Sequence, residues 1–141
     1  MIIYEVIPGL LVSNFPRPLD SVLIRDRDVR AIVTLTRAAP SPEVIAIARS
    51  WLHLPLPDSR SVPVSGCDIA VTWIEGQRAA GRTVLVHCRE GRNRAALVAG
   101  LVARRALGCT GEEAWRRIKD LRPLALYNAA YADHLRGLGV P

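Results

Sequence analysis

Short apolar runs alternate along the chain with polar stretches that contain proline, glycine and charged residues. Runs with the length and composition of strands lie at residues 2–6, 10–12, 31–35, 52–54 and 83–86. The run 83–86, Thr-Val-Leu-Val, is rich in β-branched residues and has no charge on either face, which is typical of a strand covered on both sides. We therefore predict a sheet in which residues 83–86 form a central strand.

Between these runs apolar residues recur at helical spacing, at residues 19–24, 42–51, 65–81, 95–107, 110–121 and 127–138. Ser41-Pro42-Glu43 supplies an N-cap, a proline in the first turn and an early acid, and Trp51 completes the apolar face of that helix. Thr110 and Glu113 have the spacing of a capping box. The segment 95–107 is apolar nearly all round, which predicts a helix buried in the core.

This alternation predicts an α/β fold with a mainly parallel central sheet of four to five strands flanked by helices. A chain of 141 residues is long enough to bury one core and too short for two ordinary ones, so we expect residues 1–141 to form a single domain. Ligands of such folds bind where the carboxyl end of a strand leads into a helix. Residues 86–95 occupy that position.

Composition narrows the class of protein. No apolar stretch approaches the roughly 18 residues needed to span a membrane, and the N-terminus lacks the pattern of a secretory signal. The three cysteines, Cys67, Cys88 and Cys109, are an odd number without paired spacing, so we expect free thiols in a reducing, cytoplasmic compartment. The cysteines and histidines also lack the spacing of a zinc site, and we expect neither metal nor cofactor.

The formal charge of +6 favours anionic partners. The doubled arginines are not interleaved with aromatic residues, so we expect no stable nucleic-acid complex. Phosphorylated proteins or other phosphomonoesters fit this charge, and we expect the protein to act on them as a monomer.

The segment His87-Cys88-Arg89-Glu90-Gly91-Arg92-Asn93-Arg94 has the chemistry of an anion site. Cys88, between a strand and a helix, lies near backbone N–H groups and the positive end of the helix dipole, which stabilise a nucleophilic thiolate and also suit a phosphate dianion. Gly91 allows the loop to bring several amides toward one anion. Arg94 can clamp two phosphoryl oxygens with its planar guanidinium. We therefore predict a phosphate-binding loop, with Cys88 as nucleophile.

A leaving oxygen needs a proton, and Asp58, in the proline-rich loop 55–63, is the best-placed general acid. The alternative role for Asp58 is a turn residue bonded to its own backbone, and Asp68 is then the reserve candidate. His87 is expected to support the loop by bonding backbone near Cys88 rather than to act as a base. Cys67 and Cys109 are expected to be structural, although either could form a disulfide with Cys88 if close to it.

The spacing from His87-Cys88 to Arg94 resembles the signature of the cysteine-based protein tyrosine phosphatase superfamily, and the chain as a whole resembles its small dual-specificity branch. Further matching elements are residues 6–10, Leu56-Pro57-Asp58, Arg122-Pro123 and Asn128. The resemblance implies a dual-specificity phosphatase-like fold, a phosphocysteine intermediate on Cys88, and the roles of Asp58 and Arg94. It implies hydrolysis of phosphotyrosine, phosphoserine or phosphothreonine.

Two positions depart from the pattern of this branch. The family usually has Ser or Thr directly after the loop arginine, where the hydroxyl helps the thiolate leave, and this chain has Ala95. Slow turnover, or a phosphate-binding pseudophosphatase, is therefore an open alternative. Arg89 and Arg92 make the loop resemble that of phosphoinositide phosphatases, although Glu90 offsets part of the charge, so a phosphoinositide or an RNA 5′-phosphate is a second alternative substrate.

Overall fold

Five strands form one sheet in the computed structural model, which describes residues 1–141. The strands are β1 (Ile3–Ile7), β2 (Leu10–Ser13), β3 (Val29–Thr34), β4 (Ser50–His53) and β5 (Thr83–His87). Their order across the sheet is β1-β2-β5-β3-β4, and only β1 runs antiparallel to its neighbour. The predicted α/β fold with a mainly parallel sheet is confirmed. β5 lies at the centre of the sheet, as its uniformly apolar sequence predicts.

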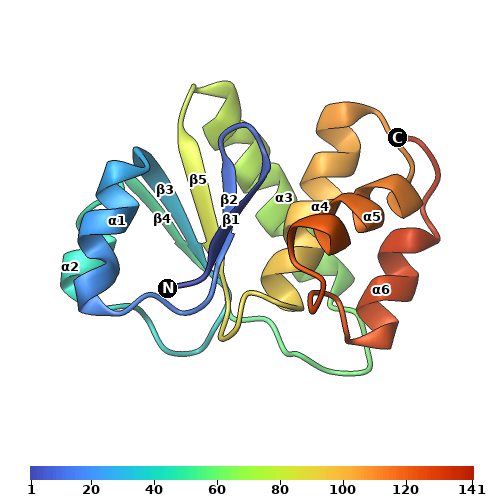
Figure 1. Ribbon diagram of the computed structural model, residues 1–141, viewed down its shortest axis with the longest axis horizontal. Helices are drawn as coiled ribbons and strands as arrows, with labels where there is room; N and C mark the ends of the chain where they lie inside the picture. The colour runs from blue at the N-terminus through green and yellow to red at the C-terminus, as the bar shows by residue number, and fades with distance from the viewer.

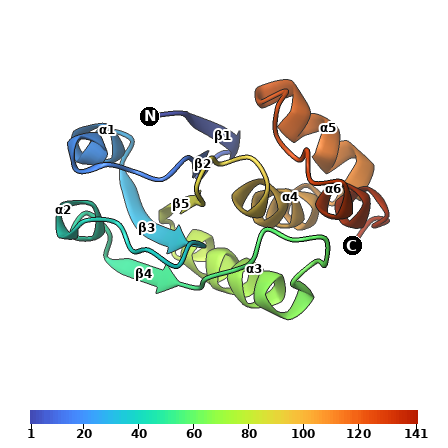
Figure 2. The same cartoon turned by 90° about the horizontal axis from the view of Figure 1, so that it is seen from below.

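Helices cover both faces of the sheet (Figure 1). One face carries α1 (Ser21–Asp26), which follows the 3₁₀ turn η1 (Pro18–Asp20), and α2 (Pro42–Ile45). The other face carries four helices, α3 (Val64–Ala79), α4 (Arg94–Leu107), α5 (Gly111–Leu121) and α6 (Ala129–Arg136). Seen from below, α3 and α4 lie next to the sheet, and α5 and α6 pack outside α4 (Figure 2). No helix combines the length and the apolar character that a membrane crossing requires.

The sheet separates two apolar cores because neighbouring residues of a strand point to opposite faces. On β5, Leu85 belongs to the smaller core beneath α1 and α2, whereas Val84 and Val86 belong to the larger core beneath the other four helices. The helix α4 lies in the middle of that larger core, and the ten residues 94–103 include nine that are buried. Since β5 and α4 are both fixed in the core, the loop that joins them is held at both ends.

Three helix ends follow the capping signals in the sequence. Thr110 accepts a hydrogen bond from the Glu113 N–H at 3.1 Å, and Asn128 accepts one from the Tyr131 N–H at 3.3 Å. Gly108 ends α4 with a left-handed backbone, at φ 61°. Asn128 therefore caps α6, although the sequence pattern predicts that this helix already begins at residue 127.

The prediction of a helix over residues 42–51 is wrong beyond its first turn. α2 ends at Ile45, and Trp51 lies on strand β4. The parallel pairing of β4 with β3 places Trp51 opposite Ile32 and His53 opposite Thr34. Ladder hydrogen bonds and the contact with the sheet therefore override the helical periodicity of residues 42–51.

Candidate active site

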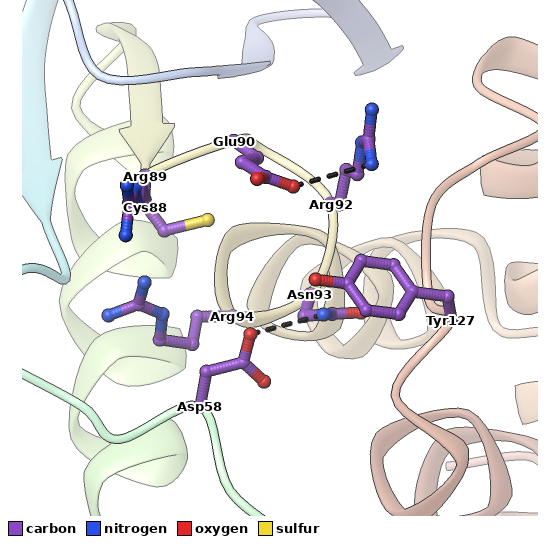
Figure 3. A pocket seen from close by; sticks show the side chains of 8 residues that line it. All are labelled: Asp58, Cys88, Arg89, Glu90, Arg92, Asn93, Arg94 and Tyr127. Atoms are coloured by element: carbon purple, nitrogen blue, oxygen red, sulfur yellow. Dashed lines mark hydrogen bonds and ion pairs between the residues drawn. The ribbon is translucent and has the colours of Figure 1, made fainter.

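A hollow of about 230 Å³ opens at the carboxyl end of β5, where the chain turns into α4. Eight residues line it: Asp58, Cys88, Arg89, Glu90, Arg92, Asn93, Arg94 and Tyr127 (Figure 3). They come from the loop 88–93, from the first residue of α4, from the loop that precedes α3 and from the connection between α5 and α6. Of the eight, all but Tyr127 are residues that the sequence assigns to the site.

Three carbonyl groups of the loop 88–93 accept hydrogen bonds from other segments of the chain. The carbonyls of Arg89, Gly91 and Arg92 accept from Phe15 N–H at 3.0 Å, Tyr4 Oη–H at 2.8 Å and Leu126 N–H at 2.7 Å. The backbone N–H groups of residues 89–93 make no hydrogen bond within the protein. A row of amides without acceptors, directly before the N-terminus of a 14-residue helix, forms a cradle for an anion.

Gly91 is required by the shape of this loop. Its φ of 67° lies in the left-handed region, which side chains other than glycine rarely adopt. A Cβ at this position would also lie 2.7 Å from the backbone carbon and oxygen of Ser13. The loop can therefore press against the end of β2 only with glycine at position 91.

Cys88 lies at the base of the hollow. Only 3% of its surface is exposed, yet it is among the lining residues, and its sulfur points toward the open space inside the loop (Figure 3). The residue directly follows β5, the most central strand of the sheet, so its position is fixed by the core. A sulfur here faces both the free amides and the positive end of the α4 dipole.

Arg94 begins α4 and lines the same hollow. One of its Nη1–H groups donates to the carbonyl of Leu56 at 3.2 Å, while its Nε is buried without a partner. The guanidinium is thus anchored to the loop that carries Asp58 and keeps unused N–H groups. Such groups can bind phosphoryl oxygens.

Two side-chain amides hold the Asp58 carboxyl group. The Nδ2 of Asn93 donates to Asp58 Oδ2 at 3.1 Å, and the Nδ2 of Asn128 donates to Asp58 Oδ1 at 2.8 Å and to the Ser59 carbonyl at 2.8 Å. The Asn128 N–H in turn donates to Asn93 Oδ1 at 3.0 Å, and Tyr131 Oη–H donates to the carbonyl of Pro57. Asp58 therefore bonds to side chains from two other segments rather than to its own backbone. The reserve candidate Asp68 lies on α3 and does not line the hollow.

His87 lies beneath the loop, fully buried, and its Nε2 is 2.8 Å from Thr34 Oγ1. The same hydroxyl accepts from the indole N–H of Trp51 at 2.9 Å. Burial lowers the pKa of His87 to about 4, with the nearby Cys88 backbone opposing this shift in part, so the imidazole is neutral near pH 7. A neutral, buried ring has no access to substrate, and its hydrogen bond goes to the neighbouring strand β3.

Charge in the loop is partly compensated internally. Arg92 Nη1 lies 3.4 Å from Glu90 Oε2, whereas Arg89 makes no ion pair or hydrogen bond (Figure 3).

Ala95, the second residue of α4, is buried and provides no hydroxyl group near the sulfur. All three cysteines are free. Burial raises the pKa of Cys67 to about 11, which keeps it a neutral thiol.

Sequence patterns did not identify three residues that support the site. Tyr127, which is 61% exposed, forms part of the rim, and no motif distinguishes it from other loop aromatics. Tyr4 reaches the loop from β1, far away along the chain. Leu126 adopts a positive φ of 55°, a strained conformation for a leucine, and in that conformation its N–H reaches Arg92. A leucine gives no sequence signal for such a backbone.

Fold and hollow together describe an α/β protein with a cysteine in a loop of free amides at the N-terminus of a helix, and comparison with known proteins identifies the family. Residues 5–128 match the family model described as "Swiss Army Knife protein, DSP-PTPase phosphatase domain". The chain belongs to this family, and so to the small dual-specificity phosphatases of the cysteine-based superfamily.

Individual relatives are distant. The chain is 23% identical over 120 residues to dual specificity protein phosphatase 8 of Mus musculus, a match that covers 84% of this chain and 18% of that protein. It thus spans less than a fifth of that relative. The crystal structure of a mouse putative dual specificity phosphatase complexed with zinc tungstate has a TM-score of 0.83 at 23% identity, over 96% of this chain and 84% of that one. The structure of PTPMT1 in complex with PI(5)P has a TM-score of 0.82 at 22% identity, over 96% and 92%. These structures share the fold.

Proposed function

We propose that this protein hydrolyses phosphate monoesters through a covalent phosphocysteine at Cys88. The observation that carries this proposal is the convergence, in one hollow, of the Cys88 sulfur, five unbonded N–H groups, Arg94 and Asp58. The hollow combines a nucleophile, an anion cradle, a cationic clamp and a proton donor. These are the four components that the two-step transfer of a phosphoryl group to and from sulfur requires.

In the first step the Cys88 thiolate attacks phosphorus, a sulfur–phosphorus bond forms, and the bond from phosphorus to the ester oxygen breaks. The leaving oxygen takes a proton from Asp58. The amides of residues 89–93 and the Arg94 guanidinium bind the three equatorial oxygens, where charge is spread in the transition state. The products of this step are a free alcohol or phenol and a phosphorylated sulfur.

In the second step water attacks phosphorus, the Asp58 carboxylate accepts a proton from that water, and the thiolate leaves with the bonding electron pair. Inorganic phosphate is released and Cys88 and Asp58 return to their starting states. Asn93 and Asn128 keep the carboxyl group at a fixed place through both steps, because each donates to one of its oxygens.

We infer phosphotyrosine, phosphoserine or phosphothreonine as the substrate, in line with the dual-specificity relatives. The uncompensated Arg89 and the PI(5)P complex of PTPMT1 favour a phosphoinositide as the second candidate, and an RNA 5′-phosphate shares the same chemistry. Turnover of phosphopeptides, phosphoinositides and triphosphorylated RNA by the purified protein decides among them. We expect the phosphopeptides to have the highest kcat/KM, and activity confined to lipid or RNA would refute this assignment.

Ala95 predicts slow breakdown of the phosphorylated enzyme. A hydroxyl at this position would donate a hydrogen bond to the leaving thiolate, and a bond to a charged group is worth about 1.5–3 kcal/mol, or roughly 10- to 100-fold in rate. With an aryl phosphate in a stopped-flow instrument we expect one equivalent of phenol in a burst, followed by a slow steady rate. Ala95→Ser should raise the steady rate at least about tenfold.

The same experiment tests the pseudophosphatase alternative. A wild-type burst followed by almost no steady turnover, even with Ala95→Ser, would favour a phosphate-binding protein over an enzyme. Ala103→Ser, at a buried alanine further along α4, is the matched control for the effect of adding a hydroxyl to this helix. It should leave the steady rate unchanged.

A further inference from the structure

Two further depressions adjoin the catalytic hollow, and we call the three together the trough. One, of about 570 Å³, shares Asp58, Asn93 and Tyr127 with the hollow and has Arg60 in its wall. The other, of about 510 Å³, shares Arg94 with the hollow and has Arg37 in its wall. In Figure 3, Arg94 and Tyr127 lie on opposite sides of Asp58. The trough therefore continues from the hollow in two directions.

Each end of the trough carries a positive charge that the protein does not neutralise. Arg37 and Arg60 are exposed and make no ion pair or hydrogen bond. Some other surface arginines, such as Arg105 and Arg136, pair with glutamates at 3.0 and 2.7 Å, whereas no carboxylate lies within ion-pair distance of Arg37 or Arg60. The charges at the trough ends are therefore available to a ligand.

The trough contains only two carboxylates, and neither can serve these arginines. Asp58 is held by the amides of Asn93 and Asn128, and Glu90 pairs with Arg92. Between each charged end and the hollow the wall is formed by uncharged residues, with Pro55 and Pro57 on the Arg37 side and the exposed ring of Tyr127 on the Arg60 side. A ligand that fills the trough therefore meets positive charge at both ends and a mostly neutral path between each end and the hollow.

We propose that the substrate is a peptide segment that carries acidic side chains on both sides of its phosphorylated residue, with Arg37 and Arg60 as the specificity-determining residues. This inference rests on the proposed function and names the substrate class of the same site. An extended chain advances about 3.3 Å per residue and places side chains well to either side of the phosphate. It therefore suits two charges in separate depressions better than a compact, ring-shaped phosphate ester does.

Four phosphopeptides of equal length test this proposal, with acidic residues on both sides, on one side, on the other side, or replaced by alanine. Exposed ion pairs contribute little individually, so we expect each acidic flank to raise kcat/KM about two- to fivefold at low salt. Arg37→Ala should abolish the advantage of one flank and Arg60→Ala that of the other. Arg25→Ala and Arg49→Ala, at exposed and unpaired arginines outside the trough, are the matched controls and should keep both preferences.

A charge reversal separates recognition from a structural role. Arg60→Glu should make a basic residue on its flank better than an acidic one, whereas an equal loss for all four peptides would overturn the proposal. Higher kcat/KM for an inositol polyphosphate or a phosphoinositide than for the doubly acidic peptide would also overturn it.

Failure of the inference can be distinguished from failure of the proposed function. If the wild type hydrolyses an aryl phosphate but does not discriminate among the four peptides, the inference is wrong and the function stands. If the wild type hydrolyses no phosphate ester, the function is wrong. The dissociation constants of the peptides from the Cys88→Ser protein then decide the inference, which predicts the same ranking and fails if all four bind equally.

Discussion

Replacing Cys88 by serine should abolish hydrolysis while leaving phosphate binding intact. The serine hydroxyl stays protonated near pH 7, so it is a far weaker nucleophile than a thiolate, and we expect kcat to fall by at least about 10³-fold. The amides of residues 89–93 and Arg94 remain in place in the variant. Phosphopeptide should therefore bind the variant at least as tightly as the wild type, as measured by calorimetry.

Cys109→Ser provides the control for this result. Cys109 is a free, partly exposed thiol between α4 and α5, outside the hollow, so its replacement should leave kcat unchanged. If Cys88→Ser kept more than a few per cent of the activity, or if the control lost activity as well, the nucleophile would have to be sought elsewhere. Mass spectrometry of the quenched wild type should place the added phosphate on the peptide that contains Cys88.

Replacing Asp58 by asparagine should slow the release of poor leaving groups by about 10²- to 10⁴-fold, the usual contribution of a general acid. An alkoxide, as from phosphoserine, cannot leave without a proton, whereas nitrophenolate needs little assistance. The ratio of kcat/KM for the two kinds of substrate should therefore widen in the variant, because kcat/KM reports the phosphorylation step even when breakdown of the phosphorylated enzyme limits kcat. Rates measured with a series of phenyl and alkyl phosphates give this ratio directly.

Asp68→Asn provides the control for the Asp58 variant. Asp68 is an exposed carboxylate on α3 and does not line the hollow, so its replacement should leave the rates for alkyl and aryl phosphates unchanged. If Asp68→Asn lost activity on the poor leaving groups and Asp58→Asn did not, Asp68 would be the acid.

Local pattern determined the elements on which the site is built. The apolar run 83–86 predicts a central strand and the segment 95–107 predicts a buried helix, because each of these arrangements covers the many apolar side chains of its segment. The loop between them, with Gly91 and Arg94 at fixed spacing from Cys88, follows from those anchors. The chemistry of a strand end meeting a helix N-terminus is local, so one segment of sequence was sufficient to predict it.

The prediction from sequence was wrong where a local helical pattern conflicted with strand pairing between segments far apart in the chain. Trp51 fits the apolar face of a helix that starts at Pro42, but the free edge of β3 binds its backbone as a strand. Periodicity describes one segment at a time, whereas the stability of β4 comes from hydrogen bonds to residues about twenty positions away. A sequence read without knowledge of the sheet order contains no sign of this competition.

Tertiary structure alone decided how the Asp58 carboxyl group and the trough beside it are assembled. Asp58, Asn93 and Asn128 are separated by 35 residues at each step, and only the packing of α6 against the loops brings the two amides to the two carboxyl oxygens. The same folding places two unpaired arginines, Arg37 and Arg60, at the ends of the trough. Sequence specifies which groups can ionise or bind, but their partners depend on distances that arise only when the chain has folded.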